Sequence, residues 1–188
     1  MAVELVYETH CTSTDNEAGI ATGWLPGRLS TTGRQQAREL GARRRDGVVA
    51  GFSSDLHRAV QTAQIAFAGS GIPIHQDARL RECNYGTLNG APVTQLAAQR
   101  RHHIRAPFPE GESYQQVVDR TAEFLRDLIR DWNGQRVVVI AHSANRWALD
   151  VLVHRRRLSD LVDAPFGWQP GWIYQISADD QGAGYPRP

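Results

Sequence analysis

The chain has 188 residues, with 21 basic and 20 acidic side chains and a net charge of +1. A chain of this length is expected to form one domain with a substantial core. The charge balance argues against a protein that coats nucleic acid or an anionic membrane. No apolar run approaches the roughly 18 residues of a membrane span, and the first ten residues lack the pattern of a secretory signal. We therefore expect a cytoplasmic protein.

Two further features of the composition limit the chemistry. The two cysteines do not make a disulfide framework. All 21 basic residues are arginines, which excludes any mechanism that needs a Schiff-base lysine or a P-loop lysine.

Short apolar runs alternate with amphipathic segments along the chain. We expect strands at residues 3–7, 48–52, 72–75, 136–141 and 172–176, and helices at residues 30–45, 57–67, 113–132 and 144–154. Ser30 is a plausible N-cap for the first of these helices, in which Gly33 is a mild cost. This alternation predicts an α/β fold, a three-layer sandwich with a mostly parallel central sheet and helices on both faces.

Residues 80–109 interrupt the alternation. The segment is rich in Gly, Asn, Pro, Arg and His, and we expect it to form a lid or insertion over a site. Residues 1–177 are then expected to form a single domain, and residues 178–188 a loose tail.

Reactive side chains follow three of the predicted strands. His10 follows the first strand, Ser54 and Arg58 follow the second, and His142 and Ser143 follow the strand at residues 136–141. Ligands bind beyond the carboxyl ends of the strands in open α/β sheets, so these side chains are expected to converge. A single histidine near the end of a strand is more often structural than catalytic. Two imidazoles with an arginine suit an anionic substrate, and no metal or cofactor is implied.

Several motifs occur in a characteristic order. The segment SSDLHRAVQTA at residues 53–63 is long and specific. It is accompanied by Thr9-His10-Cys11, Leu80-Arg81-Glu82, Gly111-Glu112-Ser113 and VVVIAHS at residues 137–143. From Leu5 to about Leu152 the chain thereby resembles the histidine phosphatase superfamily, in its phosphoglycerate mutase-like branch.

The resemblance implies a metal-independent phosphomonoester hydrolase that acts on a small phosphorylated metabolite through a phosphohistidine. His10 would be the nucleophile, Arg58 and His142 would neutralise the phosphoryl oxygens, and Glu82 would protonate the leaving oxygen. That role requires a raised pKa for Glu82. The alternative interpretation is that Glu82 is a solvated carboxylate in a loop. The remaining expected phosphate contacts are Thr9, Ser13, Asn16, Ser143, Arg81 and Arg146.

The first motif departs from the family pattern. Thr9 stands where the family has an arginine, and Cys11 stands where it has a glycine. Trp147 occupies the position of an arginine in the last motif. Loss of one charge-assisted donor costs about 10²- to 10³-fold in rate, and Arg81 or Arg146 is a candidate replacement. Three explanations stay open: a phosphatase with an altered pocket, an enzyme that converts a different anionic substrate, or a protein that lost catalysis and kept binding.

Two other features have competing interpretations. Cys11 is either a rival nucleophile activated by a neighbouring imidazole or a side chain that merely fills a small-residue position, which we favour. Arginine clusters at residues 43–45, 100–105 and 155–157 indicate either a basic rim or RNA-binding face, or solvated helix ends. We favour the solvated ends, and expect a small phosphorylated substrate, no nucleic acid or membrane partner, and allow for a homodimer.

Overall fold

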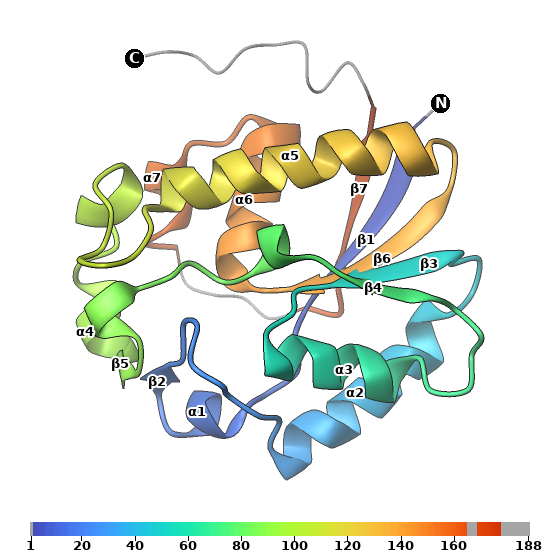
Figure 1. Ribbon diagram of the computed structural model, residues 1–188, viewed down its shortest axis with the longest axis horizontal. Coiled ribbons are helices and arrows are strands. Elements are labelled where there is room, and N and C mark those ends of the chain that lie inside the picture. Colours follow the sequence, from blue (N-terminus) through green and yellow to red (C-terminus); the bar gives the residue numbers. More distant parts are fainter. Residues whose placement is uncertain (1, 165–168, 178–188) are drawn as a thin grey trace.

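A five-stranded sheet forms the centre of the molecule (Figure 1). The computed structural model describes residues 2–164 and 169–177, so the predicted tail at residues 178–188 lies outside the described residues. The strand order is β4-β3-β6-β1-β7. The first four strands in this order are parallel and β7 is antiparallel to β1. The strands are β1 (Val3–Thr9), β3 (Ala50–Ser53), β4 (Ile74–Gln76), β6 (Arg136–Ala141) and β7 (Trp172–Ile176).

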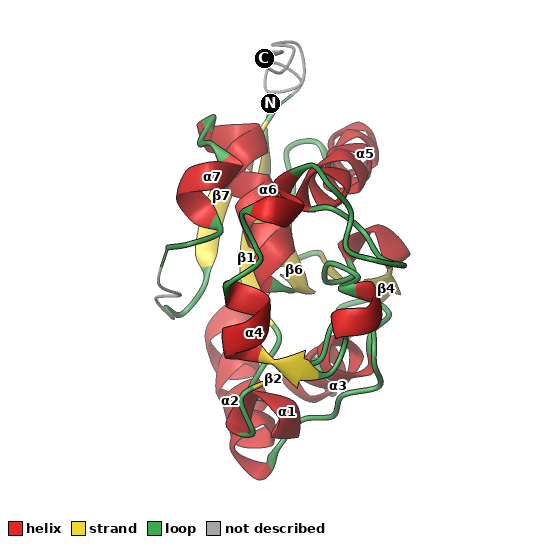
Figure 2. Cartoon of the chain, turned by 90° about the vertical axis from the view of Figure 1, so that its left-hand side faces the viewer, coloured by secondary structure: helices red, strands yellow, loops and turns green. Residues whose placement is uncertain are grey.

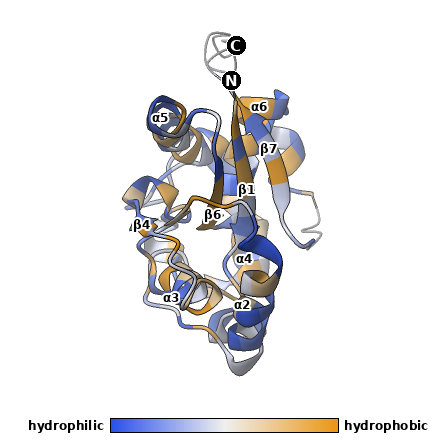
Figure 3. Cartoon of the chain, turned by 90° about the vertical axis from the view of Figure 1, so that its right-hand side faces the viewer, coloured by the Kyte–Doolittle hydropathy of each residue, from blue (hydrophilic) through white to orange (hydrophobic). Residues whose placement is uncertain are grey.

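Two pairs of helices cover the two faces of this sheet (Figure 1). Side chains of α2 (Thr31–Arg44) and α3 (His57–Ala66) pack with Val6, Val138 and Ile140 on one face. Side chains of α5 (Tyr114–Trp132) and α6 (Ser143–His154) pack with the alternate residues of β1 and β6 on the other. Figure 3 shows the hydrophobic residues gathered along the central strands. The expected three-layer α/β sandwich is therefore confirmed.

The start of α2 shows why a glycine stands at residue 33. Ser30 caps the helix as predicted, because its Oγ accepts a hydrogen bond from the Gly33 N–H at 3.1 Å. A Cβ at Gly33 would lie 1.9 Å from the backbone oxygen of Thr12. Glycine is thus required for the close approach of α2 to the loop after β1, and is more than a mild cost to the helix.

The segment at residues 80–109 contains only short elements. They are η1 (Ala78–Leu80) at its start, η2 (Gly86–Leu88), β5 (Ala91–Pro92), α4 (Val93–Ala97) and η3 (His102–Ile104). Strand β5 pairs antiparallel with β2 (Ile20–Ala21), which follows α1 (Thr14–Glu17). Figure 2 shows α4 and β2 next to each other, above α1. The short elements of this segment, together with α1, β2 and α7 (Leu158–Leu161), were not predicted, because they are too short to show a hydrophobic period.

An aromatic cluster fixes this segment to the helical layer. Tyr85 and Phe108 belong to the segment, and Tyr114 and Trp147 belong to α5 and α6. Consecutive rings lie edge to face, with centroids 5.4, 5.9 and 5.4 Å apart from Tyr85 to Trp147. The segment therefore has a packed base. Among the described residues, we find no helix with the length and apolar character that a membrane span requires.

Candidate active site

Three strand ends meet at one edge of the sheet. Strands β1 and β3 both pair in parallel with β6, so the residues that follow them emerge side by side. His10 follows β1, Ser54 follows β3, and His142 follows β6. The two imidazole rings have centroids 5.1 Å apart. The predicted convergence of the two histidines and Arg58 is therefore confirmed.

The tautomer of His10 is set by the backbone. Its Nδ1 lies 2.8 Å from the carbonyl oxygen of Cys11, and a carbonyl only accepts, so Nδ1 carries the proton. The lone pair of the ring is then on Nε2, which accepts from Arg58 Nε at 3.2 Å. Burial lowers the pKa of His10 to about 3, with a smaller contribution from the charge of Arg58. His10 is therefore a neutral imidazole at neutral pH, with a deprotonated Nε2 that accepts from Arg58 in this structure.

His142 is fully buried beneath His10. Its Nε2 lies 2.7 Å from the hydroxyl of Ser54, and its Nδ1 lies 3.3 Å from Arg58 Nη2. The hydroxyl of Tyr7 donates to the His142 carbonyl. Burial, followed by the charge of Arg58, holds the pKa of His142 well below its usual value. Both imidazoles are therefore neutral, and the cation beside them is Arg58.

The guanidinium of Arg58 has one nitrogen without a hydrogen-bond partner among the described residues. The residue is 2% exposed. Its Nη2 donates to the carbonyl of Gly23 at 2.9 Å as well as facing His142. Its Nη1 is buried and has no hydrogen-bond partner among the described residues. Arg58 also lines the smaller hollow, so its guanidinium is placed to donate to an anionic acceptor bound there.

Glu82 supplies a carboxyl group to the same site. The residue is 8% exposed, and its Oε1 accepts from the backbone N–H groups of Cys83 at 2.8 Å and Ala144 at 3.3 Å. Burial raises the pKa of Glu82, and these hydrogen bonds and Arg58 oppose that shift. Glu82 is thus no solvated loop carboxylate, and its pKa is shifted in the direction that an acid catalyst requires.

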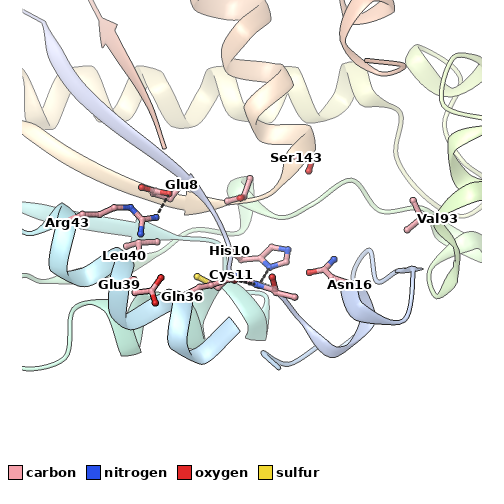
Figure 4. Close-up of a pocket in the computed structure, with 12 residues that line it drawn as sticks. Glu8, His10, Cys11, Asn16, Gln36, Glu39, Leu40, Arg43, Val93 and Ser143 are labelled. Carbon is pink, nitrogen blue, oxygen red and sulfur yellow. Dashed lines mark hydrogen bonds and ion pairs between the residues drawn. The ribbon is translucent and has the colours of Figure 1, made fainter. Parts of the chain in front are cut away.

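Two hollows meet at His10. The larger has a volume of about 610 Å³ and extends past Thr9, Cys11 and Arg43 (Figure 4). The smaller, of about 130 Å³, contains Arg58 and Glu82. The two hollows share His10, Asn16, Val93 and Ser143.

The predicted phosphate contacts fall into two groups. Asn16 and Ser143 line both hollows, and Thr9 lines the larger one. Ser13 is buried and lines neither. Its Oγ accepts from Asn16 N at 3.1 Å, and Asn16 Oδ1 accepts from Ser13 N at 2.9 Å. Ser13 caps α1 and so holds Asn16 in place.

The two candidate replacements for the missing arginine point elsewhere. Arg81 forms a bidentate pair with Asp55 at 2.7 and 2.5 Å. Arg146 lies 3.7 Å from Asp150 and 5.0 Å from the centroid of the Trp172 ring. Neither residue lines either of the two hollows at His10. In this structure no replacement by Arg81 or Arg146 is formed, because each guanidinium is held by other partners.

The structure adds residues that were not among the expected phosphate contacts. Arg100, Tyr85 and Trp147 line the smaller hollow. Arg100 belongs to the arginine cluster at residues 100–105, whose members differ in environment. Arg100 lines the hollow, whereas Arg101 pairs with Asp163 at the surface. Only the fold distinguishes these two neighbouring arginines.

The rival nucleophile is poorly suited to its task. Cys11 lines the larger hollow, but burial raises the pKa of its thiol to about 11. The reactive form of cysteine is the thiolate, which is scarce at neutral pH under those conditions. Within residues 2–164 and 169–177, no group of three or more His, Cys, Asp or Glu side chains is arranged to hold a metal ion.

The chain is similar to several known proteins in sequence and in fold. The chain is 31% identical over 190 residues to the 2,3-bisphosphoglycerate-dependent phosphoglycerate mutase of Cytophaga hutchinsonii, covering 93% of this chain and 88% of that protein. It superposes on YhfR of Bacillus stearothermophilus with a TM-score of 0.78 and 26% identity, over 89% and 88% of the two chains. It superposes on a mycobacterial glucosyl-3-phosphoglycerate phosphatase in complex with VO3 with a TM-score of 0.73 and 27% identity, over 85% of each chain.

The family model named histidine phosphatase superfamily, branch 1, matches residues 9–183. These relatives and neighbours include both phosphatases and a phosphoglycerate mutase. The chain belongs to the histidine phosphatase superfamily, branch 1.

Proposed function

We propose that the protein hydrolyses a small phosphorylated metabolite, a phosphomonoester, through a phosphohistidine at His10. The observation that carries this proposal is the contact of the Arg58 guanidinium with the deprotonated Nε2 of His10, since both residues line the smaller hollow. A phosphoryl group at this point accepts from the guanidinium while its phosphorus faces the imidazole lone pair. Phosphoryl transfer depends mainly on such positioning and charge stabilisation.

The first step forms a bond between His10 Nε2 and phosphorus and breaks the bond from phosphorus to the leaving oxygen. The Glu82 carboxyl gives its proton to that oxygen, so the product leaves as a neutral alcohol. The neutral state of both histidines supports this assignment, because a protonated His10 has no lone pair on Nε2. Arg58 then balances part of the charge on the equatorial oxygens.

The second step returns the site to its starting state. A water oxygen attacks phosphorus, its proton passes to the Glu82 carboxylate, and the phosphorus–nitrogen bond breaks to release phosphate. Dividing hydrolysis into two displacements lowers the barrier of each. Asn16 and Ser143 line both hollows at His10, where their polar groups are available to the phosphoryl oxygens.

Phosphate release from a panel of phosphomonoesters tests the proposal, with the native protein beside His10→Ala and Cys11→Ser. We expect release by the native protein and by Cys11→Ser, and none by His10→Ala. Release that persists in His10→Ala contradicts a phosphohistidine route. If no substrate is turned over between pH 5 and 8, the protein instead binds or converts a different anionic ligand.

A further inference from the structure

The backbone carbonyl of Glu82 is held by two side chains from distant parts of the chain. Trp24 Nε1 donates to it at 2.7 Å, and Arg120 Nη2 donates to it at 3.0 Å. Trp24 lies in the loop after β2, and Arg120 lies on α5. A carbonyl with both lone pairs occupied by fixed donors has little freedom to rotate.

Arg120 also fixes the chain on either side of Glu82. Its Nη1 donates to the carbonyl of Arg79 at 2.6 Å. Its Nε and Nη2 donate to the two carboxylate oxygens of Glu112 at 3.0 and 3.1 Å. Glu112 in turn accepts from the N–H of Asn84 at 2.9 Å. One guanidinium therefore braces the backbone before residue 82 and, through Glu112, after it.

The indole of Trp24 is itself held in place. The guanidinium carbon of Arg81 lies 4.6 Å from the centroid of the Trp24 ring, and Arg81 is fixed by its bidentate pair with Asp55. The backbone N–H of Trp24 donates to Asn89 Oδ1 at 3.3 Å. This arrangement gives Arg81 a use in supporting the indole, away from the phosphate site.

Neither Trp24 nor Arg120 lines either hollow, whereas Glu82 lines the smaller one. We propose that Trp24 and Arg120 are positioning residues, whose shared hold on the Glu82 carbonyl aims the Glu82 carboxyl at the leaving oxygen. This inference rests on the proposed function. Proton transfer requires a separation of about 2.6–3.2 Å between the two heavy atoms, so a small rotation of the Glu82 peptide is enough to impair it.

The consequence is a dependence on the leaving group. p-Nitrophenolate is a stable anion and departs without a proton, whereas the alkoxide of glycerol needs one. A loosened Glu82 therefore slows the hydrolysis of β-glycerol phosphate and leaves p-nitrophenyl phosphate nearly unaffected. A general loss of structure slows both substrates together.

The test compares kcat/KM for these two substrates in Trp24→Phe, which keeps an aromatic six-membered ring and removes the indole N–H together with the five-membered ring. We expect about a 10-fold loss on β-glycerol phosphate, part of the 10²- to 10⁴-fold effect of a general acid, and less than about a 2-fold loss on p-nitrophenyl phosphate. Arg120→Lys, which keeps the charge but loses the fork of donors, is expected to show the same selectivity. Arg126→Gln is the matched control, because Arg126 lies on the same helix with its side chain 57% exposed.

Equal losses on both substrates, or no loss on either, overturn the inference. Glu82→Gln serves as the reference and must itself be selective for the alkyl substrate. If it is not, or if the native protein releases no phosphate, the proposed function has failed. The effect of the two hydrogen bonds to the Glu82 carbonyl is then tested by carbon-13 NMR titration of the Glu82 carboxyl. Trp24→Phe must shift this titration to lower pH, because water then reaches the carboxyl. An unchanged titration overturns the inference independently of activity.

Discussion

Replacing Arg58 with methionine separates the cost of this buried cation to folding from its value to the reaction. The side chain is buried without an ion-pair partner among the described residues, and burial lowers its pKa. Its Nε faces His10, its Nη2 faces Gly23 and His142, and its Nη1 has no hydrogen-bond partner among the described residues. Methionine has a similar length and apolar stem but no charge and no donors.

The variant is expected to lose about 10³-fold in kcat/KM, because a single oxyanion donor is worth about 10²- to 10³-fold and here a charge is lost as well. Its free energy of unfolding should remain within about 2 kcal/mol of the native value. Removing an unpaired buried charge is favourable, and this offsets the acceptors that lose a donor. The pKa of His10 should rise from about 3, because the charge of Arg58 is the second-largest cause of its lowering, after burial.

Three measurements check this reasoning: steady-state kinetics, urea unfolding, and NMR titration of the His10 ring protons. Arg58→Lys is the companion variant, and an intermediate rate is expected because one ammonium cannot reach all of the guanidinium's partners. The reasoning is refuted if Arg58→Met keeps more than about a tenth of native activity, or if the pKa of His10 does not move.

Three further outcomes are expected. Below pH 6.5 both histidines bind protons in the unfolded chain. In the folded protein His10 and His142 stay neutral, because their pKa values are lowered. The free energy of unfolding should therefore fall by about 1.4 kcal/mol per pH unit from His10 between pH 6.5 and about 3, and His142 should steepen the fall below pH 6.5. Urea unfolding measures this, and His10→Gln must flatten the slope. Cys11→Ser should keep kcat/KM within about 3-fold of native, and a larger loss on the substrate panel would restore the cysteine as a nucleophile. Thr9→Arg should raise kcat/KM by about 10-fold or more, because its guanidinium has room in the larger hollow beside His10; unchanged kinetics would show that a missing cation does not limit the rate.

The centre of the site was predictable because it depends on strand ends. Apolar runs locate β1 and β6, and parallel pairing then brings His10 and His142 together. The same logic places Arg58 at the start of the helix after β3. These positions follow from backbone topology, which the hydrophobic pattern determines.

The direction of long polar side chains was not predictable in this way. Arg81 and Arg146 follow reactive residues in the sequence, yet Asp55 and Trp172 draw their guanidinium groups away from the hollows. An arginine spans several ångströms, so its final place depends on partners that only the folded chain brings near. Arg100 shows the reverse case, because it lines the smaller hollow although we favoured solvent exposure for the arginine cluster at residues 100–105.

The central claim is that His10 carries the phosphoryl group during turnover. The most direct test is rapid quenching of the reaction in alkali, where phosphohistidine is stable, followed by mass spectrometry of the digested protein. We predict one phosphoryl group per chain on His10, formed and consumed at rates that match phosphate release, and no such group in His10→Ala. Phosphate release without a labelled His10, or a label on another residue, would contradict the account.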